Sequence, residues 1–279
     1  MLLQRYTLRT LARELVLVLV AAIWLIPFYF LIVVSLKPST ELFSDPLALP
    51  KHATLGNYPQ AWRGTGVVTL GAALKNSVII TVGSVVCLIA VGSSCAYAIA
   101  RRLDRFGTAL YLFFVMGIIL PFQLGIVPAY VAVRKLGLAG TYPGMILLYT
   151  SLLMPLTVFL YTGFFRTLPS DYEEAAYVDG ASRRRTFARI IFPLLRPVTA
   201  TVAVLAAMII WNDFFVQLIF LSGSKRQTLP VAIYSFVGEF AAQWPVIFAA
   251  VIVTIAPLLG FYLFAQRTLV RGFTGGIKS

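Results

Sequence analysis

The chain alternates between long apolar runs and short polar segments, and six of the runs are long enough to cross a membrane as helices. A helix needs about 20 apolar residues to span the hydrocarbon core of a bilayer. We expect six transmembrane helices, over residues 15–36, 76–100, 108–128, 142–165, 197–221 and 244–266. The strands of a membrane barrel would instead be about 10 residues long, with alternating apolar and polar positions. The pattern therefore predicts an all-α, polytopic membrane protein.

The composition of the chain is that of a membrane protein rather than of a soluble domain. Of the 279 residues, 59% are hydrophobic and 12% are charged, whereas soluble domains carry about 25% charged residues. These values exclude a disordered chain, a secreted disulfide scaffold and an ordinary soluble enzyme. The net charge is +13, but a nucleic-acid binder does not need such an apolar excess, so we expect no nucleic acid as a partner. Cys87 and Cys95 lie in one apolar run and His52 is the single histidine, so we expect neither a metal nor a cofactor.

Basic residues are distributed unevenly among the connections between the runs. Of the 23 Lys and Arg residues, 15 fall in the N-terminal segment, in the connections after the second and fourth runs, and in the C-terminal tail. Because basic residues accumulate on the cytoplasmic side, both termini are expected in the cytoplasm. We expect a cytoplasmic N-terminal segment over residues 1–14, a transmembrane domain over 15–266 and a cytoplasmic tail over 267–279. The transmembrane domain includes an outer loop at 37–75 and a cytoplasmic insertion at 166–196.

The cytoplasmic insertion is predicted to form two helices separated by a glycine turn. Ser170 is a good N-cap, and Glu173 stands three residues later, as in a capping box. Gly180 is expected to end the first helix. Ser182 is expected to begin a second helix that ends before Pro193. A short helix with small residues and a few acids suits insertion into a cleft on another protein.

The spacing within this insertion resembles the EAA loop of ABC importer permeases. Glu174-Ala175-Ala176 is followed by Gly180, Ile190 and Pro193 at the spacing of that loop, with Phe192 where leucine is more usual. Further motifs resemble the carbohydrate-uptake branch of this family, and they are residues 35–37, 41–43, 57–58, 76–77, 96–101, 211–213, 228–231 and 272–276. The six expected helices, the short N-terminus and the tail at 272–276 resemble the smaller subunit of maltose-type permeases.

The resemblance implies a function and a set of partners. It implies a permease subunit that forms half of the pathway for a sugar or a related solute in an ATP-driven importer of a bacterial or archaeal cytoplasmic membrane. Its partners would be a second permease subunit, two ATPase subunits and an extracytoplasmic solute-binding protein. The chain lacks G-x-x-x-x-G-K-[ST], so it is not expected to bind ATP through a P-loop or to be an enzyme. The residues implied to contact the ATPase are Asp171, Glu173, Glu174, Ala175, Ala176, Asp179 and Gly180.

A second group of polar residues falls inside the apolar runs. An intramembrane carboxylate is a candidate functional group, because its burial is unfavourable unless it is paired. Packing against a neighbouring helix is the alternative role. The candidates for the translocation path are Gln123, Asn212, Asp213 and Gln217.

Two other functions remain open at this point. An ion-gradient-driven secondary transporter would need several intramembrane ionisable groups and usually has internal repeats. A membrane enzyme would need clustered His, Cys or acidic residues. Neither alternative explains the EAA spacing.

Overall fold

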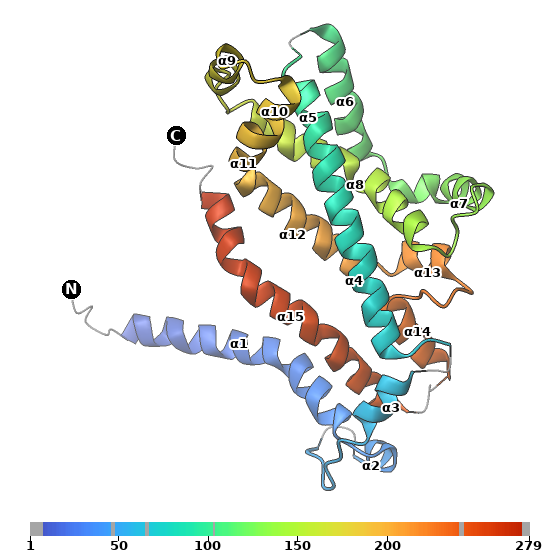
Figure 1. The fold of residues 1–279 in the computed structure, drawn as a ribbon. Helices are drawn as coiled ribbons and strands as arrows, with labels where there is room; N and C mark the ends of the chain where they lie inside the picture. Colours follow the sequence, from blue (N-terminus) through green and yellow to red (C-terminus); the bar gives the residue numbers. More distant parts are fainter. Residues whose placement is uncertain (1–7, 46–47, 65–66, 103, 240–242, 275–279) are drawn as a thin grey trace. The chain divides into compact units, whose positions relative to one another are not determined.

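The computed structural model describes residues 8–45, 48–64, 67–102, 104–239 and 243–274, and this part of the chain is helical, without strands (Figure 1). The chain divides into two compact units. The first comprises residues Met1–Leu70 and Ile233–Pro257, and the second comprises Gly71–Ala232 and Leu258–Ser279. The all-α class predicted from the hydrophobic pattern is therefore confirmed.

The first unit contains an apolar helix followed by a folded polar segment. Its helices are α1 (Leu8–Ser35), α2 (Ser39–Ser44), α3 (Asn57–Arg63), most of α14 (Leu229–Glu239) and the first part of α15 (Trp244–Thr274). The buried Asn57 amide donates hydrogen bonds to the carbonyls of Ser35 at 2.8 Å and Lys37 at 2.9 Å. The expected outer loop is thus tied to the end of α1, where the backbone carbonyls would otherwise lack partners.

The second unit is organised around α8. Its helices are α4 (Leu70–Cys87), η1 (Leu88–Gly92), α5 (Ser93–Ala100), α6 (Arg105–Ile119), η2 (Phe122–Gly125), α7 (Ile126–Lys135), α8 (Tyr142–Phe165), α9 (Asp171–Val178), α10 (Arg183–Thr186), η3 (Phe187–Ile191), α11 (Phe192–Leu194), α12 (Arg196–Asn212) and α13 (Phe215–Leu221). α8 packs against α5, α6 and α12 (Figure 1). Met145 and Tyr161, near its two ends, belong to two separate apolar clusters. α8 therefore connects these two clusters.

The expected span over residues 108–128 is wrong as a single helix. α6 ends at Ile119, and the segment from Phe122 to Lys135 is bent from it by 94°. Pro121 has no amide to donate, and a residue before proline avoids the helical region. Leu120 is accordingly extended, with φ −70° and ψ 127°. The proline therefore breaks the span.

The expected span over residues 197–221 is also interrupted. α12 ends at Asn212, Asp213 is extended, and α13 begins at Phe215. The side chain of Gln217 donates to the Ile210 carbonyl at 2.7 Å, and the Asp213 carboxylate accepts from the Val216 amide at 3.3 Å. Because these contacts give backbone groups on both sides of the break a side-chain partner, the break is compatible with a membrane environment.

The remaining predicted spans agree with the structure to different degrees. The range 142–165 coincides with α8, whereas α1 and α4 begin earlier than expected and α15 extends past residue 266. Among the described residues, three helices are long and apolar enough to cross a membrane, or up to five if each of two bent pairs forms one span. The sixth expected span falls on α15, where Trp244–Pro257 forms a shorter apolar helix. The count of six spans stays a prediction.

Candidate functional site

The insertion between α8 and α12 forms the predicted pair of helices with a glycine turn. α9 covers Asp171–Val178, and α10 begins at Arg183. Gly180 has φ +75°, a left-handed conformation that glycine adopts without steric penalty. The Ala181 amide donates to the Ala176 carbonyl at 2.9 Å and closes the end of α9. The glycine turn is therefore confirmed.

The predicted capping box at the start of α9 is wrong. Ser170 is helical in backbone conformation and its side chain accepts no amide hydrogen bond. Its hydroxyl instead donates to the Glu174 carboxylate at 3.1 Å. Glu173 does not reach back to the N-cap, because its carboxylate is engaged elsewhere.

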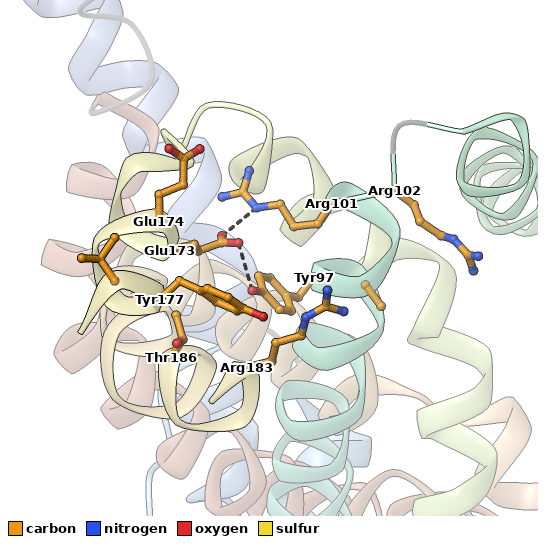
Figure 2. A pocket seen from close by; sticks show the side chains of 10 residues that line it. Tyr97, Arg101, Arg102, Glu173, Glu174, Tyr177, Arg183 and Thr186 are labelled. Atoms are coloured by element: carbon orange, nitrogen blue, oxygen red, sulfur yellow. Dashed lines mark hydrogen bonds and ion pairs between the residues drawn. The ribbon is translucent and has the colours of Figure 1, made fainter. Parts of the chain in front are cut away.

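Glu173 connects α9 to the end of α5. Its carboxylate accepts from the Arg101 guanidinium at 2.7 Å and from the Tyr97 hydroxyl at 3.0 Å. Arg101 also donates to the Leu168 carbonyl, at 3.3 and 3.4 Å from its two terminal nitrogens. Figure 2 shows the Glu173 carboxylate between Arg101 and Tyr97, whereas Glu174 is turned away from Tyr97. One arginine thus joins three segments of the chain.

The two sides of α9 differ in burial. Ala176 is 4% exposed and is the buried residue of this helix. Glu174, Ala175 and Asp179 are exposed, as are Asp171 and Gly180. Tyr177 and Val178 are 68% and 88% exposed. The sequence interpretation did not single out these two apolar residues, although their position beside the glycine turn could have indicated a surface for a partner.

A cavity of about 910 Å³ lies between α9, α10 and α5 (Figure 2). Arginine and glutamate side chains lie on its walls together with two tyrosines. The lining residues are Tyr97, Ala98, Arg101, Arg102, Glu173, Glu174, Tyr177, Val178, Arg183 and Thr186. α9 therefore lies beside a hollow on this side rather than being packed closely along α5.

The second helix of the insertion passes Pro193 instead of ending before it. α10 continues into a π-helical turn over Phe187–Ile191 and then into α11, which contains Pro193. Proline removes a backbone donor and crowds the preceding turn of a helix. A π-type turn is wider than an α turn, and we attribute the tolerance of Pro193 to this widening. The Phe187 ring lies 5.1 Å from the ring of Tyr97. The π-helical turn thereby packs against α5.

The polar residues expected in the membrane spans lie apart from α9 in sequence and on other elements. Asp213 accepts a hydrogen bond of 2.6 Å from the Tyr149 hydroxyl. Gln217 is 2% exposed and bonds both the Ile210 carbonyl and the Thr228 hydroxyl. Asn212, which donates to the Met208 carbonyl at 2.8 Å, is exposed. Gln123 is also exposed, on η2.

Comparisons with known proteins agree with this architecture. The family described as "Binding-protein-dependent transport system inner membrane component" matches residues 88–274. The melibiose/raffinose/stachyose import permease protein MelC of Bacillus subtilis is 36% identical over 259 residues, which cover 92% of each chain. The probable starch degradation products transport system permease protein AmyC of Thermoanaerobacterium thermosulfurigenes is 35% identical over 259 residues, covering 93% of each.

A solved structure supports the fold. A chain from the crystal structure of a bacterial ABC transporter involved in the import of the acidic polysaccharide alginate aligns with a TM-score of 0.80. The alignment covers 95% of this chain and 99% of that chain at 20% sequence identity. The resemblance read from the EAA spacing is thus confirmed, and the ion-gradient-driven alternative is not favoured. This chain belongs to the family of binding-protein-dependent transport system inner membrane components, the permease subunits of ABC importers.

Proposed function

We propose that the chain is one of two permease subunits of an ATP-driven importer for a sugar, and that α9 is the segment through which it receives force from an ATPase subunit. The observation that carries the second part is the burial pattern of α9. This helix of eight residues buries Ala176 in its own chain and leaves acidic and apolar side chains exposed. An exposed apolar surface beside charged groups is typical of a protein interface.

The proposed contact surface comprises two kinds of side chain. Val178 and Tyr177 supply apolar area that a cleft on the ATPase would bury. Glu174, Asp171 and Asp179 supply charges that would select a basic rim on that cleft. Ala175 is exposed and small, and allows a close approach of the two backbones. Gly180 contributes the turn rather than a contact.

The substrate class is proposed from the relatives. Melibiose, raffinose, stachyose and starch degradation products are named for two proteins that match over more than nine tenths of this chain. We propose an oligosaccharide or a related solute, delivered by a binding protein on the outer side. The excess of basic residues in the insertion supports a cytoplasmic location for α9 and for both termini.

The test is to express the chain with its second permease subunit and its ATPase, and to purify the complex through a tag on this chain. We expect the ATPase to be retained, and proteoliposomes with binding protein to take up labelled oligosaccharide, with melibiose and raffinose as first probes, when ATP is inside. The Gly180→Ala and Glu174→Gln variants should retain less ATPase. Full retention in both variants contradicts the site, and uptake by the chain alone without nucleotide contradicts the mechanism.

A further inference from the structure

We infer that Glu173 and Arg101 are positioning residues that form a polar strut between α9 and α5, so that α5 follows α9 when the ATPase moves it. This inference rests on the proposed function, because it assumes that α9 receives the force. It adds a route by which a displacement of α9 reaches a membrane helix without passing along the backbone.

Glu173 provides the polar contact between α9 and the end of α5. In the part of the chain that the structure describes, Glu173 is the α9 side chain that is hydrogen-bonded or ion-paired to α5 or to the residue that follows it. Its neighbour Glu174 bonds the Ser170 hydroxyl, within the segment that leads into α9. The cavity between α9, α10 and α5 shows that close apolar packing does not fill this space. Removal of Glu173 would therefore leave α9 connected to α5 only indirectly.

The ion pair between Arg101 and Glu173 is short and partly buried. The Arg101 and Glu173 side chains are 26% and 19% exposed, and the nitrogen–oxygen distance is 2.7 Å. Partial burial reduces the screening that makes fully exposed ion pairs weak. The Tyr97 hydroxyl occupies the other carboxylate oxygen. A carboxylate held on both oxygens has little freedom to rotate, so the link resists displacement in more than one direction.

Arg101 makes a second contact, with the segment that leads into α9. Its terminal nitrogens donate to the Leu168 carbonyl, in the connection between α8 and α9. A planar guanidinium can bond two acceptors at fixed positions, whereas a lysine ammonium cannot reproduce this fork. Arg101 therefore fixes the start of α9 as well as Glu173. The adjacent Arg102 is more exposed and pairs with Asp104 at 3.4 Å, which makes it a matched control.

The experiment measures distances between spin labels in the assembled importer in nanodiscs. Cys87 and Cys95 are replaced by alanine, and labels are attached at Ser94 in α5 and Tyr172 in α9, both exposed. A separate label pair, between Tyr172 and the second permease subunit, reports whether α9 moves when a non-hydrolysable ATP analogue is added. We expect α9 to move in the parent protein while the distance between α5 and α9 stays constant.

The variants then separate a strut from a merely structural contact. In the Glu173→Gln and Arg101→Lys variants, addition of the analogue should change the mean distance between the α5 and α9 labels or broaden its distribution. It should stay constant in the matched change Arg102→Lys, which leaves Arg101, Glu173 and the proposed ATPase contacts in place. If the Glu173→Gln variant fails to assemble, the double variant Arg101→Glu with Glu173→Arg, which exchanges the two charges, is used instead. We expect Arg101→Glu alone to abolish the constant distance and the double variant to restore it.

The outcomes distinguish this inference from the proposed function. If α9 moves in every variant and the distance between α5 and α9 is as constant in Glu173→Gln as in the parent, the strut is refuted while the proposed function stands. The same holds if the charge exchange does not restore the constant distance. If the ATPase is not retained, or the analogue does not move α9 in the parent protein, the proposed function fails and the strut fails with it.

Discussion

Tyr149 in the first half of α8 donates a hydrogen bond of 2.6 Å to Asp213 at the break between α12 and α13. The second oxygen of the same carboxylate accepts from the Val216 amide at 3.3 Å, at the start of α13. Asp213 therefore fixes the direction in which α13 leaves the break, and Tyr149 holds Asp213 in place. A single carboxylate thus serves both as a helix cap and as a bond between two helices.

Replacement of Tyr149 by phenylalanine should destabilise the second unit. The change removes the hydroxyl but keeps the ring, and hydrogen bonds between side chains in membrane proteins contribute about 1 kcal/mol. We expect a loss of about this size in the free energy of unfolding, measured in mixed micelles with denaturing detergent. Tyr130→Phe, in which the ring contact with Phe220 at 5.5 Å is kept, is the matched control. An unchanged stability of Tyr149→Phe would show that the bond contributes little.

Replacement of Gly180 by alanine should strain the turn after α9. No atom lies within 4 Å of the position that a Cβ would take, so the effect comes from the backbone, which has φ +75°. A left-handed conformation costs an ordinary residue about 1–2 kcal/mol. Gly180→Asn should be milder, because asparagine tolerates this region better. The measurement is hydrogen exchange across residues 171–182.

Gly163→Ala provides the control for this change. Gly163 lies inside α8, and it also has open space where a Cβ would be placed. Alanine in a helix interior is more favourable than glycine, so this variant should be neutral or stabilising. A loss of equal size in both variants would show that backbone conformation at Gly180 is not the cause.

A larger side chain at Ala175 and at Ala176 is expected to have two different effects. Ala176→Leu inserts three carbons where the side chain is 4% exposed, and overpacking of this kind costs about 1–3 kcal/mol. Ala175→Leu points outward and should leave folding unchanged while it reduces retention of the ATPase. Hydrogen exchange of α9 and pull-down of the ATPase measure the two effects. The two variants control for each other, because the same substitution is made at neighbouring positions that differ in burial.

Val178→Asp should weaken ATPase binding more than any change of a single acidic residue in α9. The side chain is 88% exposed, and burial of an apolar anchor in an interface commonly decides affinity. We expect the dissociation constant to rise about tenfold or more, measured with detergent-solubilised complex. Val178→Ile keeps the apolar character and should bind normally. Equal affinities for the aspartate and isoleucine variants would exclude Val178 from the interface.

Glu41 should make the segment after α2 sensitive to acid. The Lys51 amide donates to its carboxylate, as does the His52 amide, and these bonds hold the pKa of Glu41 below its ordinary value of 4.5. Because the folded pKa is lowered, the stabilisation is present above 4.5 and is lost as the pH falls through the folded pKa. Hydrogen exchange at Lys51 and His52 should therefore rise in acid, relative to the intrinsic rate.

The Glu41→Ala variant, which has no side-chain acceptor, is the reference for this measurement. It should show fast exchange of the two amides already at neutral pH, and its protection should change little with pH. Slow exchange in this variant at neutral pH would show that the carboxylate does not hold the segment.

The sequence predicted elements where local signals and the apolar pattern agreed. The bounds of α8 follow from an uncharged run that begins after Thr141, whose hydroxyl caps the Gly144 amide at 3.2 Å. The glycine turn at Gly180 was predictable for a similar reason, because a helical pattern stops at a glycine. The break at Pro121 carried a signal as well, but the apolar run continued past the proline and hid it.

Contacts between distant segments could not be read in the same way. Arg101 and Glu173 are separated by 72 positions, and nothing near Glu173 indicates that its partner is an arginine at the end of α5. The local motif instead predicted a capping box with Ser170, which the stronger contact with Arg101 displaced. The break at Asp213 was concealed because apolar residues continue on both sides of it.

The uneven burial of α9 also bears on how importers acquire new partners. Of its eight residues, Ala176 is buried, Glu173 is bonded to Tyr97 and Arg101, and Glu174 is bonded to Ser170, which leaves five whose side chains are neither buried nor hydrogen-bonded within the chain. We expect those five to accept the corresponding residues of another permease while the fold is kept. If α9 is the proposed ATPase contact, a graft of this size should redirect the chain to a foreign ATPase, and the same separation would let lineages change ATPase subunits without rebuilding the membrane domain.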